Sequence, residues 1–275
     1  MTIFSIPKPF IGKTAENQQT AVTSWCQLAP DVQVVLVGDD VGVAETARSA
    51  GAQHVGGVEC SSRGTPYIDD AFSRVAEIAE HSLGCFVNGD IVLLDDLVSA
   101  IRSSASVGPE FLLVGQNRDL PGVDQSDLGT PDSLAHLRRR AVREGVLRGP
   151  TAIDYFVFSV GLFDPMPRFA VGRAGFDNWM IWKARQLGPV VDLTDAVVAI
   201  HQSHGYGHLD GGKAEAYAGE EAARNIDLAG GRRRIYTLHD ASHRMRADGS
   251  IVRNYGSILR SRETARKIAW KLGRR

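Results

Sequence analysis

Several polar residues of this 275-residue chain stand where a buried apolar run ends, and one of them is an aspartate between two such runs. Asp90 closes the sequence Asn88-Gly89-Asp90, after the apolar run 85–87 and before the run 91–94. A carboxylate held between buried segments is well placed to bind Mg²⁺ or Mn²⁺, which take oxygen ligands. The alternative interpretation is an Asn-Gly-Asp β-turn that joins two strands.

Three histidines within eight residues form a second candidate site. His201, His204 and His208 are spaced by three and by four residues, which would place them on one face of a helix. Gly205 and Gly207 favour a loop instead. We expect His201, which directly follows a predicted strand, or else His204 to bind a metal ion. A three-histidine zinc site is the alternative.

Asp177 begins a predicted amphipathic helix over 178–187. A carboxylate at this place can act as a general base if it lies within hydrogen-bond reach of the proton that it removes. The competing interpretation is structural, because Asp is a favoured residue at the start of a helix and Trp179 and Trp182 would then belong to the core.

The elements that must position these residues alternate along the chain. Apolar runs predict strands at 3–6, 32–37, 54–55, 85–87, 111–114, 155–158 and within 190–200. Helical periodicity predicts helices at 14–28, 43–49, 67–81, 97–103, 134–142 and 178–187. This alternation predicts an α/β fold whose mainly parallel sheet is flanked by helices. Ligands of such sheets bind in the loops after the strands, which here are rich in Asp, Gly and Pro.

Charge divides the chain into two parts. The net charge is -1, yet the segment from Arg232 to the end holds 13 basic and 3 acidic residues, so the preceding part is acidic. The tail 257–275 reads as a basic amphipathic helix, which either packs on the acidic body or lies on an anionic membrane surface. We expect no nucleic-acid partner, because the basic residues are not interleaved with aromatic ones and no recognition motif occurs.

Composition also excludes some classes of protein. No apolar run approaches the roughly 18–20 residues of a membrane span. The three cysteines are scattered, which is typical of reduced thiols and not of a disulfide framework. The sequence therefore predicts a cytoplasmic protein, at most peripheral to a membrane.

Four segments carry a resemblance to a known family: Ile6-Pro7, Val37-Gly38-Asp39-Asp40, Phe86-Val87-Asn88-Gly89-Asp90 and Gly175-Phe176-Asp177-Asn178-Trp179. Over about residues 1–210 the chain resembles the GT-A glycosyltransferases, specifically a glycosyltransferase family 2-like protein. The resemblance implies a GT-A (Rossmann-like) domain with a nucleotide-sugar-binding half at 1–120 and an acceptor-side half at 121–210. Residues 211–275 would be a helical, basic C-terminal extension.

The resemblance also implies roles for the central residues of the site. In the family an Asp-x-Asp motif binds the metal ion and the nucleotide-sugar. Asp90 matches its last Asp and Asn88 replaces the first, so both residues would contact the nucleotide-sugar. The implied cofactor is Mn²⁺ or Mg²⁺, with a late histidine as an additional ligand. Asp177 matches the catalytic base, although Phe176 stands where the family often has a second acid.

The nucleotide-sugar would be held by residues of the other loops. Asp39 and Asp40, which follow the predicted strand 32–37, match the position that holds the base and ribose, and Pro7 at the end of the first strand would also contact the nucleotide-sugar. Arg63 would face the diphosphate. Arg118, followed by Asp119, would lie near the donor sugar, on whose ring Trp179 could stack.

The implied function is a hexosyltransferase-type enzyme, which moves a sugar from a nucleoside-diphosphate sugar to an unknown hydroxyl acceptor. Catalysis would be metal-assisted, with inversion through a carboxylate base. A nucleotidyltransferase that makes sugar nucleotides is one alternative, although the loop after the first strand is poor in glycine. A catalytically degenerate nucleotide- or glycan-binding module is the other.

Overall fold

The computed structural model describes residues 1–202 and 212–256. Its strands are β1 (Thr2–Ser5), β2 (Gln33–Val37), β3 (Gln53–Val55), β4 (Leu83–Val87), β5 (Ile91–Val92), β6 (Leu112–Asp119), β7 (Val146–Leu147), β8 (Ile153–Ser159), β9 (Val190–Asp192), β10 (Ala199–His201), β11 (His243–Met245) and β12 (Ile251–Arg253). Its helices are α1 (Gly12–Cys26), α2 (Val43–Ala50), α3 (Ile68–Ile78), α4 (Asp96–Ser103), α5 (Pro131–Glu144), α6 (Phe176–Leu187), α7 (Gly212–Ala218) and α8 (Glu220–Leu228).

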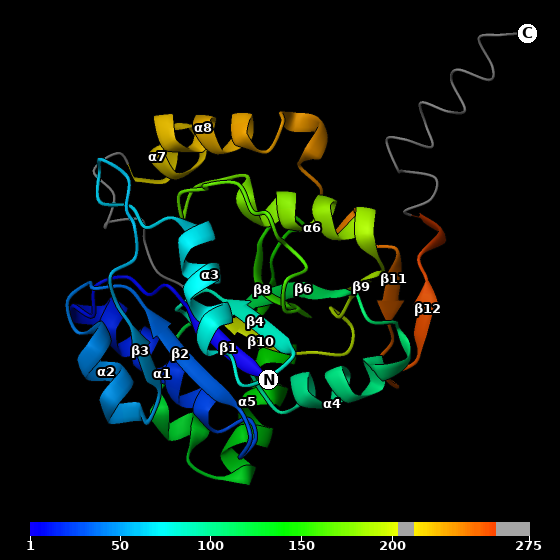
Figure 1. Ribbon diagram of the computed structural model, residues 1–275. Coiled ribbons are helices and arrows are strands. Elements are labelled where there is room, and N and C mark those ends of the chain that lie inside the picture. Colours follow the sequence, from blue (N-terminus) through cyan, green and yellow to red (C-terminus); the bar gives the residue numbers. More distant parts are fainter. Residues whose placement is uncertain (203–211, 257–275) are drawn as a thin grey trace, which may run out of the picture.

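The main sheet runs in the order β12-β11-β9-β6-β8-β4-β1-β2-β3. Most neighbours are parallel, whereas β8 is antiparallel to both β4 and β6, and β12 is antiparallel to β11. Helices cover both faces of this sheet (Figure 1). The predicted α/β fold class is therefore confirmed.

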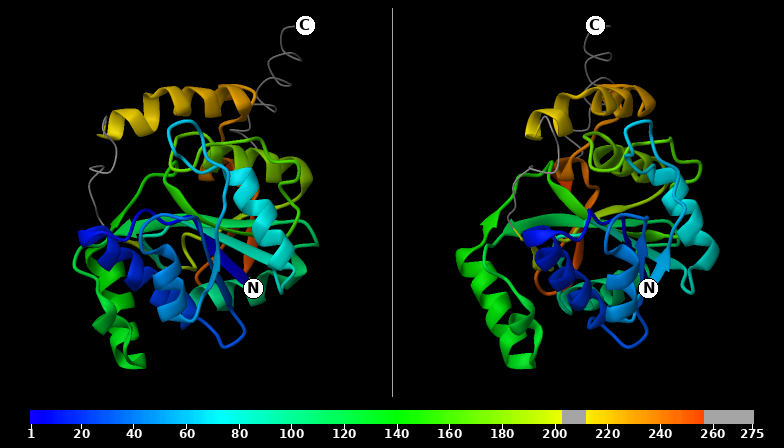
Figure 2. Two further views of the ribbon diagram at one scale, coloured as in Figure 1. Left: turned by 60° about the vertical axis from the view of Figure 1, so that its left-hand side comes forward. Right: turned by 90° about the vertical axis from the view of Figure 1, so that its left-hand side faces the viewer.

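Two hydrophobic clusters hold the helices to the sheet. On one face, α3 and α6 pack through residues such as Ile68 and Met180 against β1, β4 and β8. On the other face, α1, α2 and α4 pack through residues such as Trp25, Val43 and Leu97. Helices α7 and α8 form a further layer outside α3 and α6, which both views of Figure 2 also show. Helices thus cover both faces of the sheet, and side chains at its strand ends can form a site.

The direction of β8 decides what gathers at the functional edge of the sheet. Because β8 runs opposite to β4 and β6, its first residues lie beside the last residues of those two strands. The register shows this directly, since Tyr155 pairs with Val87 and Ile153 pairs with Gln116. Asp154, near the start of β8, therefore lies at the same edge as Asn88, which follows β4.

A small second sheet extends this edge. Strand β10 pairs parallel with the end of β6 and antiparallel with β5. Helix α5 packs beneath it through Leu137 and Ala141, against Val92 and Ile200. The Asn88-Gly89-Asp90 turn accordingly connects strands of two different sheets, so it is not the turn of a β-hairpin.

The described part of the predicted C-terminal extension belongs to the main body. Strand β11 adds to the sheet beside β9, with His243 opposite Val191. Strand β12 pairs with β11 in turn, so residues 243–253 of the predicted extension add two strands to the sheet. The basic tail 257–275 lies outside the described residues. Among the helices that the structure describes, none has the length and apolar character needed to cross a membrane.

Candidate active site at the C-terminal edge of the sheet

Asp90 is the centre of a charged cluster at this edge. The residue is only 9% exposed. Its Oδ2 lies 3.9 Å from Nε2 of His201 and 4.0 Å from Nζ of Lys8. Asp90 follows β4, His201 ends β10 and Lys8 follows β1. The fold therefore brings together residues from three distant parts of the sequence.

Strand register explains why His201 reaches Asp90. His201 pairs with Asp119 of β6 on one side and with Ile91 of β5 on the other. Asp90 immediately precedes Ile91, so it comes next to the imidazole. On the other side, Nδ1 of His201 lies 2.6 Å from Oδ1 of Asp119. This contact holds the ring with Nε2 directed toward Asp90.

The Asp90 and His201 pair is suited to a divalent cation. A carboxylate that accepts from the Nδ1–H of a histidine fixes the ring and leaves the Nε2 lone pair for a metal. An ion with bonds of about 2.1 Å spans ligand atoms up to about 4 Å apart, so both atoms could bind it together. Among the described residues, no group of three or more His, Cys, Asp or Glu side chains forms a complete metal site. His204, the second predicted metal ligand, lies outside the described residues, as does His208.

Asn88 is hydrogen-bonded to Asp154 through both its side chain and its backbone. Its Nδ2 donates a hydrogen bond of 2.7 Å to Oδ1 of Asp154, and its backbone N–H donates to the Asp154 carbonyl at 2.9 Å. An aspartate at position 88 would set two carboxylates against each other at this distance, which is electrostatically unfavourable. The asparagine therefore fits beside Asp154 without charge repulsion.

Asp154 collects two further donors beneath the site. Nδ2 of Asn117 donates to its Oδ2 at 2.5 Å, and Nη1 of Arg148 lies 2.7 Å from the same oxygen. Nε of Arg148 also lies 3.8 Å from Oδ1 of Asp119. Arg148 thus connects the Asp154 network to the His201 and Asp119 pair.

Asp177 occupies the first turn of α6, as the sequence predicts. Burial raises the pKa of Asp177 to about 7, although the backbone N–H of Asn178 opposes this by donating to Oδ1 at 2.8 Å. The carboxylate of Asp154 raises that pKa further. A carboxylic acid with a pKa near neutrality is suited to general base chemistry.

The loops after β1 and β2 meet at the side of the site expected for the nucleoside. The backbone N–H of Phe10 donates to the carbonyl of Val41 at 2.8 Å. Pro7 is buried, while Asp39 and Asp40 are exposed. Oδ2 of Asp39 accepts a 2.6 Å hydrogen bond from the backbone N–H of Gly57. The Asp39 carboxylate is therefore already hydrogen-bonded within these loops, while partial burial and the neighbouring Asp39 raise the pKa of Asp40.

Two predicted donor-binding residues, Trp179 and Arg118, make other contacts in the structure. Trp179 is 4% exposed and packs against Phe169 and Phe163 at centroid distances of 5.2 and 6.5 Å. Its proposed stacking on a sugar is therefore wrong, because its ring belongs to the hydrophobic core. Arg118 is partly buried on β6, and its Nη1 donates to the carbonyl of Gly145 at 3.4 Å.

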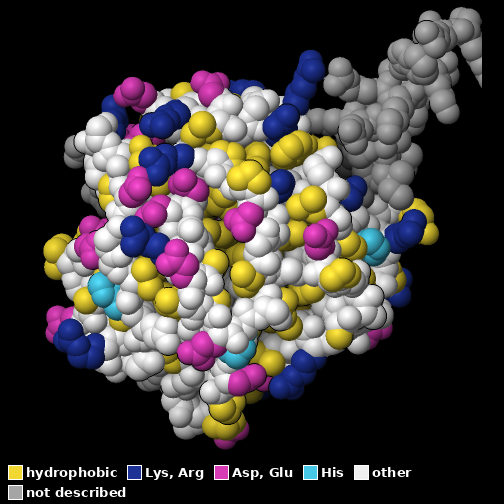
Figure 3. All heavy atoms as spheres, viewed as in Figure 1, with side chains coloured by type: hydrophobic (Ala, Val, Ile, Leu, Met, Phe, Trp, Pro, Cys, Tyr) yellow, Lys and Arg dark blue, Asp and Glu magenta, His cyan; other side chains and the backbone are white. Residues whose placement is uncertain are grey.

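Arg63 belongs to a network that fixes α7 and α8 above the site. Its guanidinium pairs with Glu220 at 2.7 Å and with Glu215 at 3.5 Å. Figure 3 shows basic and acidic side chains interleaved on this part of the surface. The guanidinium of Arg63, which we expected to face a diphosphate, is therefore already paired with two glutamates.

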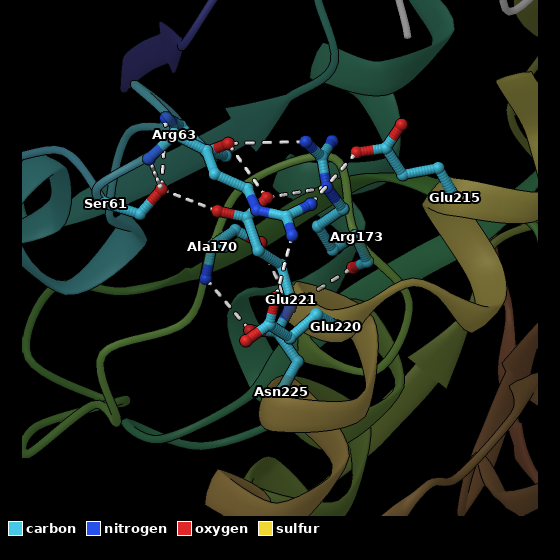
Figure 4. A network of polar contacts seen from close by, with 9 residues as sticks. Ser61, Arg63, Ala170, Arg173, Glu215, Glu220, Glu221 and Asn225 are labelled. Carbon is cyan, nitrogen blue, oxygen red and sulfur yellow. Dashed lines mark hydrogen bonds and ion pairs between the residues drawn. The ribbon is translucent and has the colours of Figure 1, made fainter. Parts of the chain in front are cut away.

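The buried centre of this network is the ion pair of Arg173 and Glu221, with side chains 9% and 11% exposed and a separation of 2.9 Å. The hydroxyls of Ser61 and Thr65 donate to the two oxygens of Glu221 at 2.5 and 2.9 Å (Figure 4). These hydrogen bonds and Arg173 lower the pKa of Glu221 despite its burial. Because Arg173 lies just before α6, the network braces the helix that carries Asp177.

Sequence reasoning missed Lys8, Arg148 and Asp154 as members of the site. An acid inside the apolar run 153–158 was the available signal for Asp154. Its location could not be inferred, because the sequence does not reveal that β8 is antiparallel.

Comparison with known proteins gives similarity of fold without similarity of sequence. No protein-family model matches the chain, and no curated protein matches it. One similar solved structure is glucosyl-3-phosphoglycerate synthase from Mycobacterium tuberculosis in complex with Mn²⁺, UDP-glucose and phosphoglyceric acid. It is 12% identical, with a TM-score of 0.49 and coverage of 84% of this chain and 79% of that one.

Two further structures match over less of their own length. S. aureus TarS in complex with UDP-GlcNAc is 16% identical, with a TM-score of 0.46 and coverage of 74% of this chain and 58% of that one. A mycobacterial protein is 14% identical, with a TM-score of 0.44 and coverage of 73% and 64%. This chain thus spans less than two thirds of the length of each. At these identities the likeness concerns the fold alone and assigns no role to any residue.

Proposed function

We propose that this protein is a glycosyltransferase, which moves a sugar from a nucleoside-diphosphate sugar to a hydroxyl acceptor. One observation carries the proposal. A carboxylate and imidazole pair suited to a metal ion and a carboxylic acid with a pKa of about 7 both interact with the Asp154 network at one edge of the sheet. Such an edge is where α/β sheets bind ligands.

Asp90 and His201 would hold Mn²⁺ or Mg²⁺, and Asp119 would keep the imidazole in its ligating orientation. The bound ion would supply charge neutralisation for the departing nucleoside diphosphate. The similar synthase and TarS were solved with UDP-sugars, and the synthase with Mn²⁺. Asp39, Asp40 and Pro7 would line the nucleoside side of the site, and Arg118 would lie on the sugar side.

Asp177 would act on the acceptor. Its carboxylate takes the proton of the acceptor hydroxyl while the hydroxyl oxygen forms a bond to the anomeric carbon. The bond from that carbon to the diphosphate oxygen breaks at the same time, and the electron pair leaves with the nucleoside diphosphate. Attack opposite the leaving group inverts the anomeric configuration.

A thermal-shift screen tests the donor side of this proposal. UDP, GDP and ADP are added to the whole chain with and without Mn²⁺, and a nucleotide that binds the folded state raises its melting temperature. We expect stabilisation by one nucleoside diphosphate that increases with Mn²⁺. Asp90→Asn should lose the Mn²⁺-dependent part, whereas Asp31→Asn at an exposed loop position should keep it.

Transfer itself is tested by release of nucleoside diphosphate from UDP-sugars with candidate acceptors. Activity that depends on Asp90 and Asp177 supports the proposal. Release of pyrophosphate from a nucleoside triphosphate and a sugar phosphate would show a nucleotidyltransferase instead. Binding of nucleotide without turnover of any donor, including its hydrolysis, would indicate a binding module.

A further inference from the structure

The backbone of Lys8 is held by two prolines and by a buried glutamine side chain. It stands between Pro7 and Pro9, and a residue before proline has a restricted backbone. Its backbone N–H donates to Oε1 of Gln18 at 2.7 Å, and its carbonyl accepts from Nε2 of the same side chain at 2.8 Å. Gln18 is 2% exposed, so the clamp is part of the core.

The same glutamine packs closely against the turn that carries Asp90. A Cβ on Gly89 would lie 2.8 Å from Oε1 of Gln18, so only glycine permits this approach without a shift. The loop of Lys8 and the turn of Asp90 are therefore packed against one buried amide. Their relative position is set by α1 and does not depend on the two charged side chains meeting.

The Lys8 ammonium ends at the carboxylate proposed to bind the metal ion. Its Nζ lies 4.0 Å from Oδ2 of Asp90, and the Lys8 side chain remains 32% exposed. A diphosphate brought to Asp90 would therefore come within the reach of a positive charge that the fold already positions there.

We propose that Lys8 binds the diphosphate of the donor and shares the neutralisation of its negative charge with the metal ion. This inference rests on the proposed glycosyltransferase function and adds a residue to its donor site. Asn88 supplies no carboxylate to the motif, because its amide is committed to Asp154. This turn therefore offers the metal ion one carboxylate, that of Asp90, and the Lys8 ammonium places a second positive charge beside it. An ammonium is an effective point charge for phosphate oxygens.

Calorimetric titration of UDP and UMP in Mn²⁺ buffer tests the inference. Lys8→Met removes the charge but keeps the length of the side chain, and Lys8→Arg keeps the charge. Lys13→Met is the matched control, because Lys13 is an exposed lysine five residues away that pairs with Glu16. GDP and GMP, or ADP and AMP, replace the uridine nucleotides if the thermal-shift screen selects another base.

We expect Lys8→Met to weaken diphosphate binding roughly tenfold to a hundredfold, as for loss of a hydrogen bond to a charged group. The loss should be smaller for the monophosphate. Lys8→Arg should retain most of the affinity, and Lys13→Met should match the wild type. Thermal unfolding without ligand checks that each variant is folded.

Equal diphosphate affinity of Lys8→Met and the wild type would overturn the inference, as would equal losses for the diphosphate and the monophosphate. Both results would leave the proposed function intact if the wild type still transfers sugar. A wild-type protein that binds none of these nucleotides would instead refute the proposed function itself.

Discussion

Replacement of Asp177 by asparagine separates the electrostatic cost of this residue from its proposed catalytic role. The substitution keeps the shape of the side chain and removes the charge. Burial raises the pKa of Asp177 from 3.8 to about 7. The folded state therefore holds the proton more tightly than the unfolded chain, and ionisation of Asp177 destabilises the fold as the pH rises from about 4 to about 7.

The size of this effect follows from the shift. About three pKa units correspond to about 4 kcal/mol, of which the interval from pH 5 to pH 8 contains about 3 kcal/mol. Asp177 is only half-buried, so screening by solvent reduces this figure. We expect the stability difference between Asp177→Asn and the wild type to grow by about 1–2 kcal/mol from pH 5 to pH 8, in favour of the variant.

Urea unfolding of both proteins at the two pH values measures this difference. Asp132→Asn is the matched control, because Asp132 is an exposed residue at the same position in the first turn of α5. Its difference from the wild type should change much less with pH. Parallel pH dependence in Asp177→Asn and the wild type would refute the argument that the carboxylate is desolvated.

Asp177→Asn also tests the catalytic role of this residue, and at pH 8 the variant should be more stable than the wild type. We expect kcat/KM of the wild type to rise with pH and level off above about 7, because the base must be ionised. Asp177→Asn should lose about 10²- to 10⁴-fold in rate, the usual contribution of a positioned base. Full activity of this variant would exclude Asp177 as the base.

Three further substitutions test residues that support the site. Asp119→Asn should lower Mn²⁺ affinity by about 10- to 100-fold, because His201 loses the carboxylate that orients its ring. Calorimetry measures this affinity, and an unchanged value would show that Asp119 and His201 do not support the metal site. Glu221→Gln should destabilise the protein by about 3–5 kcal/mol, because it leaves Arg173 buried without its charge partner. Arg63→Ala should cost at most about 1 kcal/mol, since its ion pairs are exposed; equal losses of urea stability in both variants would contradict this account.

Local patterns in the sequence were sufficient for most of the sheet and its helices. The apolar run 32–37 became β2 at Gln33–Val37, and the helical pattern 43–49 became α2 at Val43–Ala50. Hydrophobic periodicity arises from residues close together in the sequence, so it can be recognised without knowledge of the fold. The single apolar segment within 190–200 instead gave two strands, because β9 joins the main sheet and β10 joins the small one.

Residues that directly follow a strand could likewise be placed from the sequence. Asp90 and His201 both end at the C-terminal edge of the sheet, where ligands of α/β sheets bind. Arg63 and Trp179 could not be judged in this way. The first is committed to α7 and α8, and the second fills the core, and both outcomes depend on partners far away in the sequence.

The sequence by itself determined that this is an α/β protein with acidic loops after its strands, because alternation and turn residues act over short distances. Only the tertiary structure decided which side chains those loops bring together. The antiparallel direction of β8 places Asp154 beside Asn88, and strand register sets Asp119 opposite His201. Strand order, direction and register are fixed by packing between distant segments, so the chemistry of this edge is a property of the folded sheet.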